Sequence, residues 1–248
     1  MINLDKSIDS QHLTIESNHI ESTFRVLHLS DVHIPRPDVP LTLIVKTIAR
    51  LHPDVIFVTG DLFDCRATPK DVDVINSFLL QLNSIGKLLW VRGNHELKNR
   101  YSKEILDKLV IQPLMNEYIQ VRDDIEVLGV DETARYVRSQ NKSGRLTLVL
   151  SHHPESYSYH LTGPHCFQFS GHVHGGQVRV GNQGLFGPDQ GVLLKYSKGY
   201  YPMGNQNGLI VCAGLGRSIF PMRINNPSHI VVVDFIPVGY NKKSEVSV

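Results

Sequence analysis

The fold of this chain is decided at one stretch of sequence, Val55-Ile56-Phe57-Val58-Thr59-Gly60-Asp61-Leu62-Phe63-Asp64. An apolar, β-branched run ends in Thr-Gly, and a carboxylate follows where the chain must turn. This length and composition are typical of a buried parallel strand. Ligand-binding groups in open α/β sheets gather at the carboxyl ends of such strands. We therefore predict a parallel sheet with a functional site at its edge, and Asp61 is the candidate for the centre of that site.

Four further strand-like runs also end in Asp, His or Asn side chains. Residues 26–30 and 88–91 lead into Asp31-Val32-His33 and into Arg92-Gly93-Asn94-His95-Glu96. Residues 146–150 and 167–169 lead into Ser151-His152-His153 and into Ser170-Gly171-His172-Val173-His174. Any single histidine is more often a satisfied core or surface residue than a ligand. Five strand ends that all carry ligand-type side chains reverse that expectation and predict a metal site.

The remaining sequence supplies the other elements of an α/β (α+β) domain. Helical patterns cover residues 41–51, the stretch that follows Thr68-Pro69-Lys70-Asp71, and residues 102–110, with Ser102 as a cap. Short strands are predicted at 118–121, 126–130, 209–213 and 229–235, and an edge strand at 12–16 that pairs with the run at 24–30. Residues 175–206 are the least regular. Because no repeat or linker interrupts the chain, we predict a single domain over residues 1–248.

Composition narrows the classes of function. Hydrophobic residues make up 41% and charged residues 20%, as in ordinary globular proteins, and the net charge of +1 gives no reason to expect nucleic-acid binding. Cys65, Cys166 and Cys212 are far apart and form no CxxC pair, which favours reduced thiols and a cytoplasmic location. No signal peptide is visible, and no run approaches the roughly 18 to 20 apolar residues of a membrane span. Peripheral membrane contact stays open.

The donor set indicates which metals the site would bind. Imidazoles, carboxylates and one amide oxygen are too rich in nitrogen for Ca²⁺ or Mg²⁺ alone and suit Mn, Fe or Zn. In an extended chain, positions i and i+2 point the same way, so Asp31 with His33, and His172 with His174, should each reach one ion. Seven ligands are too many for one ion but natural for two divalent ions bridged by Asp61. Such a centre would attract a phosphate ester and lower the pKa of a bound water.

Taken in order, these motifs resemble the calcineurin-like metallophosphoesterases. They are Asp31-x-His33, Gly60-Asp61, Gly93-Asn94-His95-Glu96, His152 and Gly171-His172-x-His174. The later Gly214-Leu215-Gly216-Arg217-Ser218…Pro221-Met222-Arg223 is similar to the tail of a bacterial subgroup that includes UDP-2,3-diacylglucosamine pyrophosphohydrolases. The resemblance implies a mixed two-sheet β-sandwich flanked by helices. It also implies that metal-bound hydroxide attacks a phosphomonoester, phosphodiester or pyrophosphate bond.

The resemblance further assigns roles to individual residues. One ion would be held by Asp31, His33, Asp61 and His174. The other would be held by Asp61, Asn94, His152 and His172. His95 would not be a ligand; it would hydrogen-bond the phosphoryl group or protonate the leaving oxygen.

Two other functions fit the sequence less well than hydrolysis of a phosphate ester. A nuclease is disfavoured because no Lys/Arg stripe accompanies the motifs. An inactive binding scaffold would be expected to lack ligands or His95, and all are present.

Several residues near the motifs carry competing interpretations. Asp64 is expected to be a turn or helix-capping acid, and His153 a residue behind the ligands or facing solvent. Gln177 and Arg223 are either phosphate contacts or, as we favour, partners in a loop hydrogen bond and in a surface ion pair, respectively. A group of aromatic residues is expected either to line a substrate cleft or to pack on the sandwich edge: Phe186, Tyr196, Tyr200, Tyr201 and Phe220.

Overall fold

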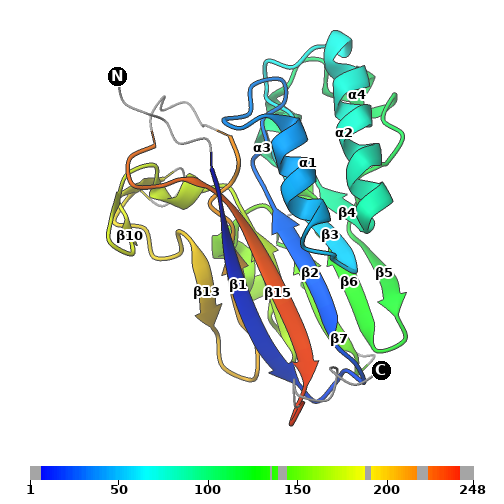
Figure 1. The fold of residues 1–248 in the computed structure, drawn as a ribbon, viewed down its shortest axis with the longest axis vertical. Coiled ribbons are helices and arrows are strands. Elements are labelled where there is room, and N and C mark those ends of the chain that lie inside the picture. The colour runs from blue at the N-terminus through cyan, green and yellow to red at the C-terminus, as the bar shows by residue number, and fades with distance from the viewer. Residues whose placement is uncertain (1–6, 135, 139–143, 188–190, 217–222, 241–248) are drawn as a thin grey trace.

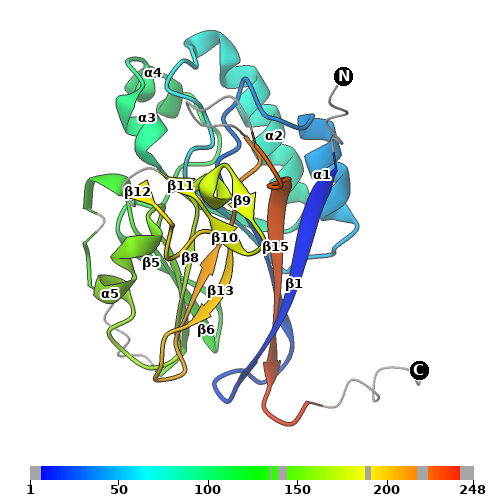
Figure 2. The same cartoon turned by 90° about the vertical axis from the view of Figure 1, so that its left-hand side faces the viewer.

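Two mixed β-sheets face each other, and helices cover the outer face of the first sheet (Figures 1 and 2). The structure is a computed structural model that describes residues 7–134, 136–138, 144–187, 191–216 and 223–240. The predicted fold class, a mixed two-sheet sandwich flanked by helices, is confirmed.

The first sheet has five strands in the order β1-β15-β2-β3-β4. Their bounds are Ile8–Ser17, Ser228–Pro237, Phe24–Leu29, Val55–Thr59 and Lys87–Val91. The N-terminal strand lies at the sheet edge as predicted, but its predicted pairing with the run at 24–30 is wrong. It pairs in parallel with β15, which separates it from β2. The reason lies in burial: β15 is buried along most of its length and needs a neighbour on each side, whereas alternating exposed residues make β1 suitable for an edge.

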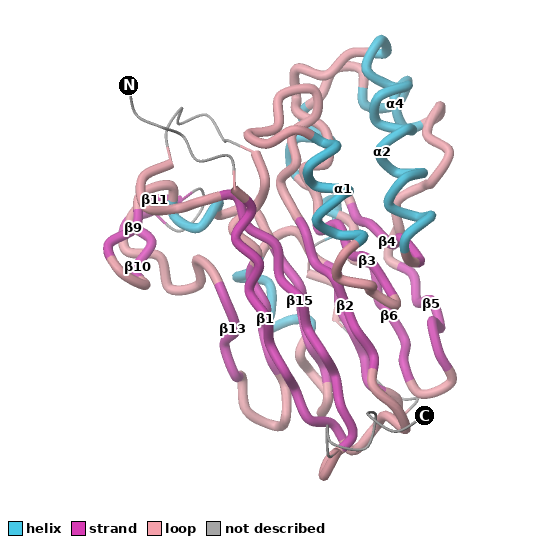
Figure 3. The backbone as a smooth tube through the Cα atoms, in the orientation of Figure 1, coloured by secondary structure: helices cyan, strands magenta, loops and turns pink. Residues whose placement is uncertain are grey.

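The second sheet has six strands in the order β13-β14-β8-β7-β6-β5. Their bounds are Gly199–Pro202, Gly208–Val211, Cys166–Ser170, Leu146–Leu150, Ile125–Gly129 and Glu117–Arg122. The four inner strands run parallel, and the two edge strands are antiparallel to their neighbours. Figure 3 shows the strands of both sheets aligned along one general axis. The carboxyl ends of β2, β3 and β4 in the first sheet and of β6, β7, β8 and β14 in the second lie at one end of the sandwich, whereas β1 and β15 run the opposite way.

Alternation along β3 explains why its sequence is apolar throughout. Ile56 and Val58 pack in a core beneath helices α1 (Leu41–Ala49) and α2 (Val72–Ile85). Val55 and Phe57 point the other way, into the core between the two sheets. Both faces of this strand are buried, as expected for a strand covered on both sides.

The predicted helices are observed, with one correction. Helix α4 spans Ser102–Leu106, shorter than the predicted 102–110, and Ser102 makes no capping hydrogen bond. Beyond Leu106 the chain continues as tighter turns, in which Lys108 N donates to Ile105 O and Leu109 N to Leu106 O. The remaining elements are short: η1 Pro69–Asp71, α3 Asn94–Lys98, η2 Glu132–Ala134, η3 Pro154–Ser156, α5 Tyr157–His160, η4 His174–Gly176, β9 Arg179–Val180, β10 Gln183–Gly184, β11 Phe186–Gly187 and β12 Gly191–Val192.

Candidate metal centre

All seven sequence-predicted ligands lie just past the carboxyl ends of parallel strands, and the structure brings them together. Those on the first sheet follow β2, β3 and β4: Asp31, His33, Asp61 and Asn94. Those on the second sheet follow β7 and β8: His152, His172 and His174. Six of the seven are buried, and Asn94 is partly buried. The two sheets thus each supply part of one buried polar cluster.

The backbone at these strand ends is not extended. Asp31, His33, Asp61, His172 and His174 have φ values of 52°, 55°, 52°, 71° and 48°, in the left-handed region. Such conformations are costly for residues with side chains and persist where the surroundings impose them. The expected extended backbone is therefore wrong for both pairs. Asp31 and His33 nevertheless reach one group of side chains, whereas His172 is not part of the group that contains His174.

Backbone hydrogen bonds between the two neighbouring strand ends hold these turns. Asp31 N donates to Gly60 O at 3.1 Å, and His33 N donates to Asp61 O at 3.0 Å. Close approach also requires glycine at two positions. A Cβ on Gly60 would meet His152 Nδ1 at 2.5 Å, and a Cβ on Gly171 would overlap Ser30 Oγ. The chain is thus packed so tightly here that side-chain directions are fixed.

A first group of four side chains can hold one ion. Asp31, His33, Asp61 and His174 each offer one ligand atom, and these atoms lie within 4.8 Å of one another. His174 Nε2 is 3.5 Å from Asp31 Oδ1, and His33 Nε2 is 3.8 Å from Asp61 Oδ2. Among the described residues, Asp31 Oδ1 and both His33 nitrogens are buried without a hydrogen-bond partner. Because buried polar atoms are normally paired, these orphaned atoms fit a bound cation.

A second group joins three side chains from three strand ends. Asn94 Oδ1 lies 3.0 Å from both His152 Nε2 and His172 Nδ1, and the two ring nitrogens are 3.1 Å apart. His152 Nδ1 donates to Thr59 O at 2.8 Å, which leaves the Nε2 lone pair facing this group. The Asn94 oxygen and the lone pair of His152 Nε2 therefore point into one space beside His172 Nδ1, and a metal ion there would take all three atoms as ligands.

Asp61 lies between the two groups. Its Oδ2 faces His33, while its Oδ1 is 3.5 Å from His152 Nε2. The backbone N–H of His95 also donates to Oδ1, at 2.9 Å, and so orients the carboxyl group. This is the placement that a carboxylate shared between two sites requires.

Burial shifts the pKa of nearly every group in the cluster. It raises the pKa of Asp31 to about 7 and the pKa of Asp61 well above its ordinary value, with the Glu96 carboxyl adding to the second shift. It lowers the pKa of His33 to about 3 and that of His174 well below its ordinary value. Neutral imidazoles keep their lone pairs available, and a nearby cation would favour the ionised carboxylates.

The predicted catalytic residue His95 faces the cluster from helix α3. Cys65 N donates to its Nδ1 at 3.3 Å, so Nε2 carries the proton in the neutral ring. That Nε2 lies 3.9 Å from Asp61 Oδ2, and the ring is 4.5 Å from the His33 ring. Burial lowers the pKa of His95. In this state the ring presents an N–H donor to the centre.

Asp64 is more than the turn acid expected from the sequence. It is buried, and its Oδ2 lies 3.7 Å from the Nδ1 atoms of both His33 and His95. Burial raises its pKa, but hydrogen bonds from Arg66 outweigh that effect and lower the pKa below its usual range. Asp64 thus lies beside both imidazoles as a carboxylate, at distances longer than a hydrogen bond. Its spacing of three residues from Asp61 was the signal that sequence reasoning passed over.

Glu96 has a structural role in the site that the sequence did not predict. Its buried carboxyl accepts three backbone N–H groups, from Asp61 at 2.9 Å, Phe63 at 2.9 Å and Gly93 at 2.7 Å. These donors belong to the two loops that follow β3 and β4. Glu96 therefore holds together the loops that carry Asp61 and Asn94.

His153 is buried behind the second group rather than facing solvent. Its ring lies 4.1 Å from the His172 ring, and its nitrogens contact Glu132 at 2.9 Å and Glu155 at 3.0 Å. Burial lowers its pKa, but the bonds to the two glutamates outweigh this and raise the pKa to about 9. This agrees with the expected position behind the ligands.

The tail motif supports the first group from behind. Leu215 N donates to Ser30 O at 3.1 Å, and Gly216 N donates to Asp31 O at 2.6 Å. Arg223 donates to Ala213 O and Gly216 O, and its Nε lies 3.3 Å from Asp38 Oδ2. The ion pair favoured from the sequence is thus present, but it is largely buried and not on the surface. The motif residues Arg217, Ser218, Pro221 and Met222, and the aromatic Phe220, lie outside the described residues.

The irregular segment packs on the outer face of the second sheet. Tyr196 is buried with Leu194, and Tyr201 packs against that cluster, where its hydroxyl accepts from Ser197 N at 3.0 Å. Tyr200 packs against the core between the sheets. For these tyrosines the structure shows the packing role. Phe186 differs, because it is half exposed on β11.

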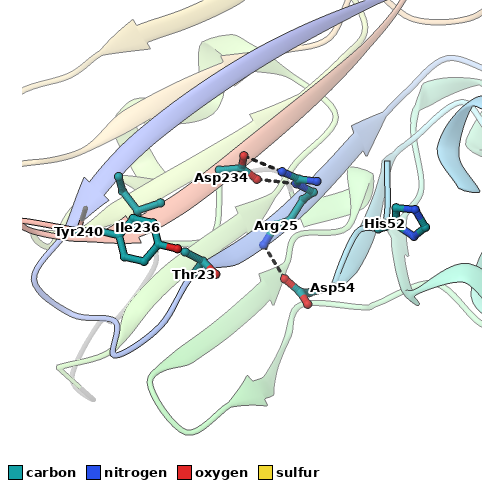
Figure 4. Close-up of a pocket in the computed structure, with 7 residues that line it drawn as sticks. All are labelled: Thr23, Arg25, His52, Asp54, Asp234, Ile236 and Tyr240. Atoms are coloured by element: carbon teal, nitrogen blue, oxygen red, sulfur yellow. Dashed lines mark hydrogen bonds and ion pairs between the residues drawn. The ribbon is translucent and has the colours of Figure 1, made fainter. Parts of the chain in front are cut away.

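A separate hollow of about 220 Å³ lies at the opposite end of the first sheet (Figure 4). It is lined by Thr23, Arg25, His52, Asp54, Asp234, Ile236 and Tyr240. Arg25 donates twice to Asp234, at 2.6 and 2.9 Å, and Asp54 accepts from Arg25 N. The charged groups here pair with one another, and the described residues place no metal-ligating cluster at this end. The functional site is therefore assigned to the other end of the strands.

Comparison with known proteins agrees with this assignment. The model of the calcineurin-like phosphoesterase family matches residues 24–176. Phosphodiesterase YaeI of Escherichia coli is 27% identical over 230 residues, covering 86% of this chain and 82% of that protein. UDP-2,3-diacylglucosamine pyrophosphatase LpxG of Chlamydia muridarum is 22% identical over 216 residues, covering 63% of this chain and 65% of that protein.

Other relatives are longer than this chain. An uncharacterized metallophosphoesterase of Campylobacter jejuni is 26% identical over 247 residues; the match covers 92% of this chain and 63% of that protein. A purple acid phosphatase from yellow lupin shares the fold, with a TM-score of 0.56 and 12% identity, over 88% of this chain and 50% of that chain.

Among the described residues, no helix has the length and apolar character that crossing a membrane requires.

A two-sheet sandwich with candidate metal-ligating side chains clustered at its strand ends agrees with the family match. The chain belongs to the calcineurin-like phosphoesterase family, and the resemblance inferred from its motifs is confirmed.

Proposed function

We propose that this chain hydrolyses a phosphomonoester, phosphodiester or pyrophosphate bond at a centre of two divalent ions, Mn, Fe or Zn. Asp31, His33, Asp61 and His174 would hold one ion. Asp61, Asn94, His152 and His172 would hold the other. The observation that carries the proposal is the position of Asp61, with one carboxyl oxygen facing each group.

The bound ions would supply Lewis acidity, which activates a water and stabilises charge on the phosphoryl oxygens. The protein's own groups donate hydrogen bonds and orient the imidazole rings. His95 presents its Nε2–H towards the centre and can donate to a phosphoryl or leaving oxygen. Cys65 N, which donates to Nδ1, fixes the orientation of that ring. Buried carbonyls, such as Thr59 O, fix the histidine tautomers.

Two broader proposals accompany this function. The shared core between the sheets supports a single domain over residues 1–248. All three cysteines are free, which supports a reducing, cytoplasmic location.

The test is a panel of substrates assayed with Mn²⁺, comprising nitrophenyl phosphate, its diester, cyclic nucleotides and a UDP-sugar lipid. The purified protein should hold two ions per chain by elemental analysis. Asp61→Asn should remove most activity and metal with little loss of fold, because a neutral amide bridges two cations poorly. Asp73→Asn, which neutralises an exposed acid on α2, is the matched control and should behave as wild type. An unchanged metal content and rate in Asp61→Asn would refute the proposed centre.

A further inference from the structure

Four large apolar side chains in the segment after η4 are exposed to solvent. Val180 on β9 is 66% exposed, Phe186 on β11 is 51% exposed, and Val192 on β12 and the following Leu193 are 65% and 64% exposed. Single exposed apolar residues are ordinary, whereas a group of them marks a surface that contacts another molecule. These four residues are called the apolar surface below.

The short strands that carry the apolar surface are gathered beside the candidate metal centre (Figures 2 and 3). Phe186 and Val192 lie opposite each other in the β11–β12 pair, so their side chains share one face of it. Strands β10 and β11 pack against η4, which begins at the proposed ligand His174. A molecule that contacts the apolar surface therefore lies close to the site of the proposed reaction.

Hydrogen bonds and packing hold these strands in place. Leu193 N donates to Leu185 O at 2.8 Å, and Leu194 N donates to Gly184 O at 3.0 Å. The buried Leu194 packs so closely on Gly187 that a Cβ there would meet its Cδ1 at 2.7 Å. Leu193 itself has φ 59°, a left-handed conformation that is costly for a leucine. The fold thus imposes a strained backbone on a residue whose apolar side chain stays in solvent.

The charges around the apolar surface are positive. Residues 175–216 contain three basic residues, Arg179, Lys195 and Lys198, and one acidic residue, Asp189, which lies outside the described part of the chain. Lys198 pairs with Asp9. Arg179 donates to two carbonyl oxygens and a hydroxyl, and the exposed Lys195 lies over a tyrosine ring. Among the described residues, neither of these two cations has a carboxylate partner, so the segment keeps a positive charge.

We propose that the apolar surface docks the protein on a bilayer of anionic phospholipid, with its side chains among the acyl chains and Lys195 beside the negatively charged headgroups. Exposed aliphatic and aromatic side chains next to cations complement both layers of such a bilayer, the apolar interior and the anionic surface. A second copy of this chain fits less well, because a two-fold contact through the apolar surface would bring the same cations of both copies together. The inference is independent of which bond the proposed enzyme hydrolyses.

The test is sedimentation of the full chain with vesicles made of equal parts phosphatidylglycerol and phosphatidylcholine, compared with vesicles of phosphatidylcholine alone. Wild type should bind the anionic vesicles more tightly, and added salt should weaken that binding. The double variant Phe186→Ser, Val192→Ser should bind the anionic vesicles at least about tenfold more weakly, because two apolar side chains no longer leave water. Its melting temperature should be retained, since both side chains are exposed.

The matched control is the double variant Val74→Ser, Leu80→Ser, which makes the same kind of change at two half-exposed positions of α2 and should bind as wild type does. Should the first double variant fail to fold, Leu193→Asn replaces one exposed apolar side chain by a residue that adopts a left-handed φ readily. This variant must also bind the anionic vesicles more weakly than wild type.

Three results would overturn the proposal. The first is wild type that stays in the supernatant with anionic vesicles, and the second is equal binding by wild type and the Phe186→Ser, Val192→Ser variant. The third is equal binding of wild type to both kinds of vesicle, which would remove the assignment to an anionic surface. Wild type that does not sediment but elutes as a dimer, which the same variant does not form, would assign the apolar surface to a second copy of the chain instead.

Discussion

Replacing Glu96 by Gln should lower the melting temperature of the protein without any change in its surface. The carboxyl group of Glu96 is fully buried and accepts from Phe63 N through Oε1 and from Asp61 N and Gly93 N through Oε2. A glutamine has one acceptor oxygen. In either orientation it leaves at least one of these buried N–H groups facing an NH₂ group.

The expected decrease in melting temperature follows from the number of hydrogen bonds that the glutamine cannot make. A hydrogen bond to a charged group contributes roughly 1.5–3 kcal/mol, and at least one is lost. For a chain of this length each kcal/mol corresponds to about 2–4 °C in Tm. We therefore expect Glu96→Gln to melt about 3–12 °C below wild type, and Glu96→Ala, which leaves three donors unpaired, to melt lower still.

The assay is thermal unfolding of chelator-treated protein, so that metal binding does not add to the measured stability. It is run at pH 8, because burial raises the pKa of Glu96 to about 7 and the carboxylate form is the one compared. Glu104→Gln is the control, since the ion pair between Glu104 on α4 and Lys108 just beyond it is half exposed, and such pairs contribute about 0–1 kcal/mol. A Glu96→Gln protein that melts together with the control would show that these three hydrogen bonds do not hold the loops.

Three further predictions concern the site and its surroundings. His95→Asn should keep both metals but lower kcat by about 10²- to 10⁴-fold, less for nitrophenyl than for alkyl esters, since nitrophenol needs no proton; equal losses for both would exclude the acid role. Burial raises the pKa of Asp131, but hydrogen bonds from Arg92 and Thr133 outweigh this and lower the pKa. In denaturant titrations, Asp131→Asn should therefore have a lower free energy of unfolding than wild type above about pH 5, and the difference should shrink below about pH 4, where the carboxylate becomes protonated. A difference that stays constant with pH would contradict this. Gly171→Ala should lose metal and activity, because the new Cβ overlaps Ser30 Oγ and crowds Asp31 Oδ2; normal metal content would show that the loop can move.

The candidate ligands could be predicted from the sequence because the pattern that indicates them is short-range. Each candidate ligand lies within a few positions of the apolar strand-like run that precedes it. Strand β3 and helices α1 and α2 were likewise predicted, since burial on one face or both leaves a short-range period in the sequence. The local pattern, together with the family resemblance, supplied the seven candidate ligands that the structure brings together.

Interactions between distant segments could not be predicted in this way. That β15 separates β1 from β2 depends on pairing residues more than two hundred positions apart. The left-handed turns at Asp31 and His33, and the roles of Asp64 and Glu96, depend on hydrogen bonds between neighbouring strand ends. His172 faces Asn94 and His174 faces Asp31, although only Val173 separates the two histidines in the chain. The sequence determined which groups are available at the strand ends. Only the tertiary structure decided which atoms meet, because that depends on packing between sheets and on no local pattern.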